Sequence, residues 1–343
     1  MIEEIREQPV ALARTLQAGV ARARKFQRLV EKKRPRLVVL VARGTSDNAA
    51  LFGRYLLEIA TGIPVSLAAP SIATLYRAKV DYRDALVVAL SQSGESTDTN
   101  RVLEWARARG ALTLGITNER ASTLAGLAEH VWLVRAGKER SVAATKTYTG
   151  QMLLLYLLAH ALGGRIRLPE LERLPALVAD ALGLEEEMAE LAPRYRFMNR
   201  AVVVGRGLNY ANAFEFALKL METCYVVAER FSTADLLHGP IALAEPGLPV
   251  FAFAPSGVTW ESMGQTMDKL RAMHAEVLAI SDPANREVET RASRVIRLPR
   301  QIPELLTPIP YIVPAQLFAA YLALEKGLDP DRPRTLSKVT LTL

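Results

Sequence analysis

The sequence contains few of the residues that mark several large classes of protein. Its 343 residues include one cysteine, Cys224, which excludes a disulfide framework and a zinc site made of cysteine thiolates. No apolar run reaches the ~18 residues that a membrane-spanning helix needs. The stretch from Met1 to Ala21 is charged and amphipathic, which argues against a secretory signal. We therefore expect a soluble, cytoplasmic protein with no membrane partner.

The basic residues do not form the pattern of a nucleic-acid-binding protein. The formal net charge is +7, but the 33 arginines and 10 lysines are dispersed along the whole chain. The densest cluster, Arg22 to Arg36, carries Leu29 and Val30 at helical spacing and offers no aromatic platform. A solvated helix face explains this cluster, so we expect no nucleic-acid partner. The positive balance would equally suit a small anionic substrate.

Short β-branched runs alternate with helical stretches along the chain. Arg36–Ala42 and Ala85–Leu90 are continuous apolar runs, each followed by a polar turn with a glycine and then by a helix. Such runs are typical of a parallel sheet covered by helices on both faces. Further strands are predicted at 65–69, 111–117, 130–134, 200–204, 249–254, 276–281 and 294–298, and helices at 97–109, 145–162 and 210–225.

The second half of the chain repeats the first. RLVVLVARG, which contains Gly44, matches RAVVVGRG, which contains Gly207, 163 residues later, and a helix follows each. We therefore expect an α/β fold of two tandem, doubly wound, flavodoxin-like parallel-sheet domains. The predicted parts are an N-terminal helical segment (1–35), a first domain (36–163), a connecting helix that packs across both halves (164–198), a second domain (199–325) and a tail with Lys338 (326–343).

Two polar loops leave strand ends in the first half. Gly44-Thr45-Ser46 and the longer loop from Ser91 to Thr97 each lead into a helix, whose first N–H groups favour an anion. Neither loop fits the lysine-bearing P-loop or the dinucleotide fingerprint. Helix N-capping would explain one such loop. The longer loop, with four donors around Gly94, favours phosphate binding.

These loops, together with Ser141–Lys146, resemble the sugar isomerase (SIS) family, and more narrowly the isomerase half of glutamine–fructose-6-phosphate transaminases. The similarity runs from about Arg36 to Leu343 and continues through Ala217–Glu222, Leu237–Pro240 and Pro333–Lys338. The resemblance implies that the phosphate of a hexose 6-phosphate is held by the first loop and the longer loop, and that a backbone group touches the sugar. The residues concerned are Thr45, Ser46, Ser91, Gln92, Ser93 and Ser96 for the phosphate, with Ser96 where the family has Thr, and Val142 for the sugar.

A lysine and a glutamate in the second half carry the proposed chemistry. Lys219 and Glu222 are three residues apart on a predicted helix and so share a face. Spacing alone favours a surface ion pair. The neighbouring residues are apolar, however, and a carboxylate in such a site can act as a general base. The resemblance assigns the C1–C2 proton transfer to Glu222 and places Lys219 beside it.

A histidine and a second lysine complete the predicted set. His238 precedes Gly239-Pro240, and an imidazole that titrates near neutrality suits the opening of a pyranose ring. The resemblance implies that this histidine reaches the site of a neighbouring subunit, which makes a homodimer obligatory. Lys338 lies in the tail, where a lysine is ordinarily mobile. The resemblance implies that it closes over the open-chain sugar and can form an imine with the ketose carbonyl.

The chain departs from the family's synthases at its start. Those enzymes carry a glutaminase domain with an N-terminal cysteine, whereas this sequence begins Met1-Ile2 and places Cys224 inside a helix. We therefore expect free ammonia rather than glutamine, no metal and no redox cofactor. The predicted activity is that of a glucosamine-6-phosphate deaminase that yields fructose 6-phosphate and ammonia, or the reverse. The alternatives are a fructosamine-6-phosphate deglycase, another amino-sugar-phosphate isomerase, a partner of a separate glutaminase subunit, and a non-catalytic sugar-phosphate sensor.

Overall fold

The computed structural model describes residues 1–338, and contacts divide the chain into two compact α/β units. The N-terminal unit contains Glu7–Arg140, Ala144–Pro175 and the described residues from Leu336 onward. The C-terminal unit contains Met1–Arg6, Ser141–Ala143 and Ala176–Thr335. The chain therefore exchanges short segments between the two units. The division into five parts that we predict from the sequence stays a prediction.

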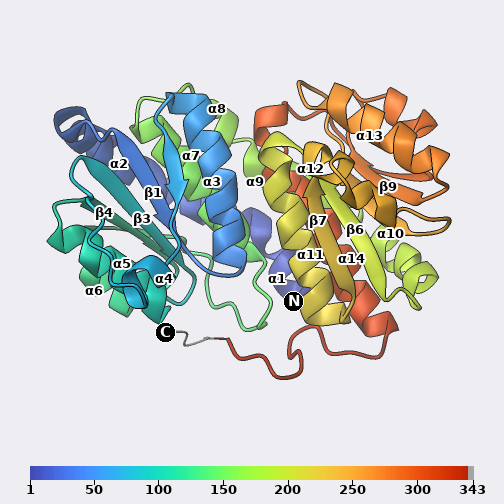
Figure 1. Ribbon diagram of the computed structural model, residues 1–343, viewed down its shortest axis with the longest axis horizontal. Helices are drawn as coiled ribbons and strands as arrows, with labels where there is room; N and C mark the ends of the chain where they lie inside the picture. Colours follow the sequence, from blue (N-terminus) through green and yellow to red (C-terminus); the bar gives the residue numbers. More distant parts are fainter. Residues whose placement is uncertain (339–343) are drawn as a thin grey trace. The chain divides into compact units, whose positions relative to one another are not determined.

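The N-terminal unit is built on a five-stranded, fully parallel sheet in the order β2-β1-β3-β4-β5. Its inner strands β1 and β3 lie side by side (Figure 1) and consist almost entirely of buried aliphatic residues, as expected for strands covered on both faces. This order confirms the doubly wound, flavodoxin-like arrangement. The strands are β1 (Leu37–Val41), β2 (Val65–Leu67), β3 (Ala85–Ser91), β4 (Leu112–Thr117) and β5 (His130–Leu133).

Three long helices, α2, α3 and α7, pack together in this unit. α2 packs against α7, and α7 also packs against α3. The basic stretch of the sequence lies on α2, whose Leu29 side is partly covered while its lysines and arginines are mostly exposed. α7 is buried along nearly its whole length, and its residues 152–159 form an unbroken apolar run. The helices are α2 (Gln8–Lys33), α3 (Thr45–Thr61), α4 (Ser71–Thr74), α5 (Thr97–Ala108), α6 (Thr123–Leu127), α7 (Lys146–Ala161) and α8 (Leu168–Leu171).

The C-terminal unit repeats the topology of the first. Its parallel sheet has the order β10-β9-β8-β6-β7, which is the same winding when it is followed from the β7 edge. This confirms the duplication that we predict from the 163-residue offset. Strand β7 has no counterpart in the sequence prediction, because Glu229 and Arg230 interrupt its apolar character at the sheet edge. The strands are β6 (Arg200–Gly205), β7 (Val227–Ser232), β8 (Pro249–Phe253), β9 (Glu276–Ser281) and β10 (Arg294–Arg297).

The prediction of a single connecting helix is wrong. The chain after α7 forms short helices instead, because Pro169 and Pro175 lack the N–H group that a helix interior requires and Gly183 follows the end of α9. Pro193 then begins a 3₁₀ turn. Beyond α8, the helices of the chain are α9 (Leu174–Leu182), α10 (Glu185–Leu191), α11 (Tyr210–Cys224), α12 (Thr233–Leu237), α13 (Trp260–Ala272) and α14 (Pro308–Glu325), with α1 (Ile2–Arg6) at the start.

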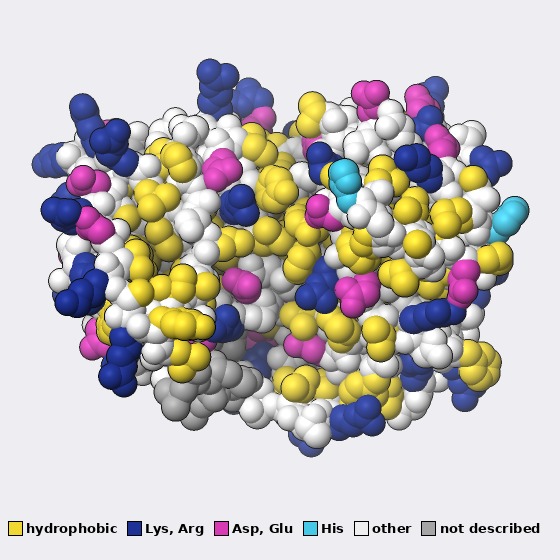
Figure 2. All heavy atoms as spheres, viewed as in Figure 1, with side chains coloured by type: hydrophobic (Ala, Val, Ile, Leu, Met, Phe, Trp, Pro, Cys, Tyr) yellow, Lys and Arg dark blue, Asp and Glu magenta, His cyan; other side chains and the backbone are white. Residues whose placement is uncertain are grey.

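Across residues 1–338, no helix is both long and apolar enough to cross a membrane. Figure 2 shows lysine and arginine side chains scattered over one face, with acidic side chains between them. This face therefore has no continuous basic band of the kind that tracks a nucleic-acid backbone.

Candidate functional site

The two polar loops lie at the switch point of the N-terminal sheet. Arg43–Ser46 follows β1, and Ser91–Thr97 follows β3, the strand next to β1. The chain passes from β1 to β2 on one side and returns to β3 on the other, so the two loops border the crevice where open parallel sheets bind ligands. The loops also begin α3 and α5, whose first N–H groups have no acceptor within their helix.

Three of the predicted phosphate-binding serines are held through their oxygen atoms. The Oγ of Ser46 accepts a hydrogen bond from Gln151 Nε2 at 2.9 Å. The Oγ of Ser91 accepts from the N–H of Gly94 at 3.0 Å, and the Oγ of Ser93 accepts from the N–H of Glu95 at 3.2 Å. A hydroxyl that accepts in this way keeps its own hydrogen to donate. The three serines can therefore donate to an anion without rearrangement of the loops.

Ser96 is arranged differently from these three. Its Oγ lies 2.9 Å from Asp98 Oδ1 and 3.0 Å from Thr99 Oγ1. Because a carboxylate only accepts, Ser96 donates its one hydrogen to Asp98. Ser96 occupies the N-cap position of α5, yet its side chain caps no backbone N–H group. Helix capping therefore does not explain why a serine occupies this position. To donate a hydrogen bond to a phosphate, the Ser96 hydroxyl must first give up its hydrogen bond to Asp98.

The remaining predicted residues of the loops are half-buried. Gln92 has no side-chain partner among the described residues, so its amide group is available to a ligand. Thr45 lies in the first turn of α3.

Two buried amide side chains that the sequence analysis missed support the loops. Gln151, on α7, donates to Ser46, and Asn100, on α5, donates to the carbonyl oxygen of Gly94 at 3.0 Å. Both side chains are buried, and nothing in the local sequence indicates that they support these loops.

Gly94 shapes the longer loop. Its φ of +71° lies in the left-handed region, and a Cβ atom there would collide with the side chain of Ser122. Its carbonyl oxygen also accepts from the N–H of Leu124 at 3.0 Å. Only glycine satisfies this conformation and this close approach together.

We expect Gly94→Ala to lower both stability and sugar-phosphate affinity. The positive φ and the collision together should cost about 2–4 kcal/mol, and the displaced serines should weaken fructose 6-phosphate binding at least about tenfold. Gly62→Ala is the matched control, because Gly62 has φ +72° and no atom within 4 Å of the position that a Cβ would take, away from the loops. Urea unfolding and calorimetry measure the two effects. Unchanged affinity in Gly94→Ala would contradict this role of the loop.

A buried ion cluster lies on α11 of the C-terminal unit. Lys219 is fully buried, with its Nζ 2.7 Å from Glu222 Oε2 and 3.2 Å from Glu215 Oε1. Burial lowers the pKa of Lys219, but the two carboxylates outweigh burial and raise it overall. The surface ion pair that spacing alone favours is therefore wrong. Glu215, which the sequence analysis missed, is fully buried and lies one turn before Lys219 on the same face.

Glu222 is the exposed member of this cluster. Its side chain is 24% exposed, whereas those of Lys219 and Glu215 are completely buried. Oε2 is bound by the lysine, and Oε1 has no partner among the described residues. Lys219 fixes Oε2 of Glu222, while Oε1 is free to contact a ligand. Such a carboxylate is suited to transfer a proton between two nearby atoms of that ligand.

His238 lies apart from this cluster. It follows α12, and its ring is exposed without a hydrogen-bond partner in the described part of the chain. Gly239 has φ +129° and Pro240 begins a 3₁₀ turn, so the turn that we expect after the histidine is present. Within residues 1–338, no hydrogen bond or ion pair joins His238 to Glu222 or Lys219.

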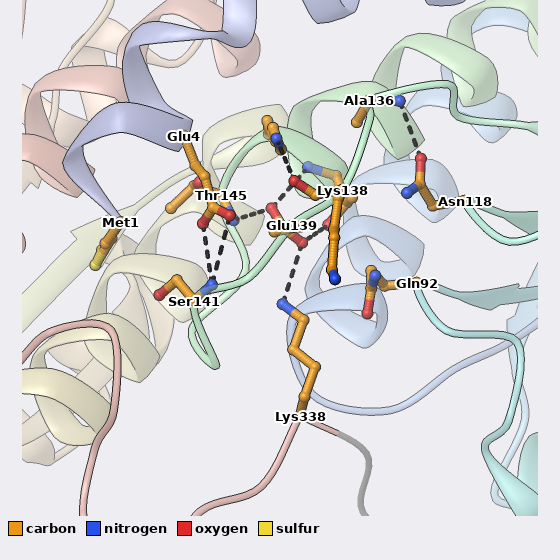
Figure 3. Close-up of polar contacts among 12 residues, drawn as sticks. Met1, Glu4, Gln92, Asn118, Ala136, Lys138, Glu139, Ser141, Thr145 and Lys338 are labelled. Atoms are coloured by element: carbon orange, nitrogen blue, oxygen red, sulfur yellow. Dashed lines mark hydrogen bonds and ion pairs between the residues drawn. The ribbon is translucent and has the colours of Figure 1, made fainter.

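Lys338 has a buried partner that the sequence analysis missed. Its Nζ lies 3.5 Å from Oε2 of Glu139, and Figure 3 shows the side chain pointing toward that carboxylate. Glu139 is buried and also accepts from the N–H groups of Thr145 and Thr147, at 2.8 and 3.2 Å. In the sequence its neighbours Lys138 and Arg140 are typical of a solvated charged loop, so this role has no local signal.

One of the two backbone polar groups of Val142, its N–H, is already hydrogen-bonded within the protein. Its N–H donates to the carbonyl oxygen of Asp331 at 3.1 Å within the C-terminal unit. A backbone contact between this residue and a sugar would therefore use the carbonyl oxygen. The predicted contact stays a prediction, limited to that acceptor.

The chain's one cysteine is not a reactive thiol. Cys224 is buried, and its Sγ donates to the carbonyl oxygen of Ala319 at 3.1 Å. Burial raises its pKa to about 11, so little thiolate forms near neutral pH. Among residues 1–338, no group of three or more His, Cys, Asp or Glu side chains is placed to hold a metal ion.

The sequence matches the model of a known protein family in two places. The SIS domain model matches residues 31–161 and again residues 196–326. The chain belongs to the SIS family. The two matches coincide with the two sheets, and they contain every predicted site residue except Lys338. The roles that we predict for these residues are taken up below as proposals.

Several relatives match nearly the whole chain. It is 37% identical to the glutamine–fructose-6-phosphate aminotransferase (isomerizing) of Pyrococcus horikoshii, over 98% of this chain and 57% of that protein. The chain thus spans little more than half the length of this relative. The C-terminal domain of the glucosamine–fructose-6-phosphate aminotransferase of Francisella tularensis has a similar structure, with TM-score 0.88 and 29% identity over 97% of this chain and 98% of that one.

A third structure shares the fold at lower identity. The glucosamine-6-phosphate deaminase of Thermotoga maritima superposes with TM-score 0.73 and 23% identity, over 97% of this chain and 100% of that chain. At this identity the likeness establishes the fold alone. The same fold therefore occurs in proteins with different names.

Proposed function

We propose that the chain isomerises a hexose 6-phosphate, and specifically that it is a glucosamine-6-phosphate deaminase. The observation that carries this proposal is the cluster on α11, where a partly exposed Glu222 is tied to a fully buried Lys219. A buried ion cluster stabilises a fold poorly, so its presence favours a chemical role for the exposed carboxylate. Membership of the SIS family and the relatives' names support a phosphorylated sugar as substrate.

The proposed reaction begins with binding and ring opening. Ser46, Ser91 and Ser93 donate hydrogen bonds to the phosphate, and the amide of Gln92 joins them. His238 moves a proton from O1 to O5 of the pyranose ring, which opens the sugar. We propose that this histidine acts on the substrate of the partner subunit in a homodimer, since within its own chain nothing described holds its ring.

Proton transfer and hydrolysis complete the reaction. Glu222 removes the proton from C2 of the open-chain amino sugar and returns it to C1, which leaves an imine at C2. Water adds to this imine, and ammonia leaves as the C2 carbonyl of fructose 6-phosphate forms. Glucosamine 6-phosphate and water thus give fructose 6-phosphate and ammonia. Lys338, released from Glu139 and present as the free amine, can form an imine with the ketose carbonyl by loss of water, and hydrolysis of that imine returns the ketose and the lysine.

We propose that this chain by itself releases free ammonia and does not hydrolyse glutamine. Glutamine hydrolysis of the kind that the family's synthases perform needs a reactive thiol. The one cysteine of this sequence, Cys224, is buried with a raised pKa. Sugar phosphates of this kind are cytoplasmic metabolites, which is the location that we propose for the protein.

Two rival functions share the phosphate loops. A fructosamine-6-phosphate deglycase or another amino-sugar-phosphate isomerase would differ in the contacts to the sugar carbons. A sensor would bind a sugar phosphate without turning it over, and such a protein would have no need of the buried cluster of Glu215, Lys219 and Glu222. That cluster therefore favours an enzyme.

A panel of substrates separates these functions. The purified protein is incubated with glucosamine 6-phosphate, galactosamine 6-phosphate and fructosamine 6-phosphate, and ammonia or free amine is measured together with the hexose phosphate formed. We expect glucosamine 6-phosphate to react with the highest kcat/KM. A higher kcat/KM for fructosamine 6-phosphate would establish the deglycase. Binding of all three compounds without turnover would establish the sensor.

A further inference from the structure

Arg43 brings a positive charge to the proposed phosphate site. Within the two loops, Arg43–Ser46 and Ser91–Thr97, the charged residues are Arg43 and Glu95. The carboxylate of Glu95 is bound by Thr123 at the start of α6, with Oε1 2.9 Å from the N–H and Oε2 2.6 Å from the hydroxyl oxygen. The arginine is therefore the charged side chain of these loops that a phosphate could use.

A buried carboxylate fixes the position of this arginine. The Nε of Arg43 donates to Oδ2 of Asp98 at 2.5 Å, and the side chain of Asp98 is 1% exposed. The other oxygen of Asp98 accepts from the hydroxyl of Ser96 and from the N–H of Thr99, at 2.9 and 2.8 Å. Both carboxylate oxygens of Asp98 therefore accept hydrogen bonds. Through Asp98, the guanidinium group of Arg43, in the loop after β1, is attached to the first turn of α5.

The outer end of the guanidinium group remains open. Nε is the nitrogen that Asp98 uses, and no described residue accepts from the terminal nitrogens Nη1 and Nη2. The side chain is 49% exposed, so a ligand can reach these nitrogens. Arg43 also contacts the first turn of α3, where the N–H of Asp47 donates to the carbonyl oxygen of Arg43 at 3.3 Å. Arg43 therefore lies beside the N-terminal turns of both helices.

We propose that Arg43 is a specificity-determining residue that binds the substrate's phosphate through Nη1 and Nη2, held in place by Asp98. The planar fork of a guanidinium group matches two phosphate oxygens, and such charge-assisted bonds are stronger than bonds from neutral hydroxyls. The serines and Gln92 would shape the site, and Arg43 would make it selective for a doubly charged phosphate ester. This inference rests on the proposed function, because it deepens the phosphate site of that reaction.

Binding measurements with two probes test this role. Inorganic phosphate and fructose 6-phosphate are titrated into wild type, Arg43→Gln, Arg43→Lys and Asp98→Asn by calorimetry, at about 50 and about 300 mM NaCl. We expect Arg43→Gln to weaken binding of both probes about 10- to 100-fold and to reduce the dependence on salt. Arg43→Lys keeps the charge without the fork and should fall between wild type and Arg43→Gln.

Two further readouts distinguish binding from a structural role. Arg43→Gln should raise KM for glucosamine 6-phosphate by the same factor while kcat stays within about threefold, because a phosphate contact acts equally in ground and transition state. Asp98→Asn should weaken binding about 3- to 10-fold, since the arginine keeps its charge but loses its charged anchor. Arg54→Gln is the matched control, because Arg54 is exposed on α3 and its substitution removes the same charge.

The outcomes separate this inference from the proposed function. Affinity of Arg43→Gln within about twofold of wild type, or a loss equal to that of Arg54→Gln, would overturn the inference even if the enzyme turns over. Failure of the wild-type protein to bind either probe would overturn it as well. Weakened binding in Arg43→Gln, in a protein that turns over no amino-sugar phosphate, would support the arginine site and contradict the proposed reaction.

Discussion

Glu222→Gln should lower kcat for glucosamine 6-phosphate by about 10²- to 10⁴-fold and leave KM nearly unchanged. The amide keeps the size of the side chain and can still accept a hydrogen bond from Lys219, so the fold of α11 should survive. It cannot take up a proton, and the transfer from C2 to C1 would lose its base. Steady-state kinetics with detection of released ammonia measures the effect.

A matched control isolates the chemistry from the change of charge. Glu229→Gln makes the same substitution on β7 in the same unit, where the side chain is exposed and no described residue binds it. We expect wild-type kinetics from this variant. If Glu222→Gln keeps the wild-type kcat, the proton-transfer role is wrong, whatever reaction the protein catalyses.

Lys219→Met should destabilise the protein by about 3–5 kcal/mol. Methionine has a similar length but no charge, so the fully buried Glu215 would keep a negative charge without its partner. Because the folded-state pKa of Lys219 is raised above that of a free lysine, the wild-type cluster contributes fully at neutral pH and loses its contribution only in strongly alkaline solution. Urea unfolding near pH 7 measures the difference in free energy.

A double variant tests whether the buried charge is the cause. Glu215→Gln combined with Lys219→Met removes the unpaired carboxylate and should recover at least about half of the lost stability. Equal stability of Lys219→Met and wild type would contradict the account of a tightly coupled buried cluster. Equal instability of the single and double variants would assign the loss to packing instead.

The sequence predicted the fully buried central strands and three of the edge strands, β2, β5 and β10, but it missed the edge strand β7. Arg36–Ala42 and Ala85–Leu90 are unbroken apolar runs, because their residues contact helices above and below the sheet. Strand β7 is an edge strand in which the adjacent charged residues Glu229 and Arg230 interrupt the apolar run, which hides it from such a search. The segment around Pro169 and Pro175 was predicted as a helix from its composition, and its prolines divide it.

In the candidate site, too, the sequence predicted the features that depend on neighbouring residues and missed those that depend on the folded structure. The serine loops were predictable because their residue types and spacing are local properties of the chain. Spacing could not decide whether Lys219 and Glu222 form a surface pair or a buried cluster, since burial depends on the elements that cover α11. Glu139 and Gln151 were missed for a related reason, because each acts on a residue far away in the sequence.

The most direct test of the proposed reaction is the stoichiometry of its two products. Wild-type protein is incubated with glucosamine 6-phosphate, and ammonia and fructose 6-phosphate are measured in the same samples over time. We predict that the two products appear in equal amounts, and that Glu222→Gln forms both products far more slowly than the wild-type protein does. Calorimetry that shows glucosamine 6-phosphate bound, with no ammonia released during prolonged incubation, would contradict it.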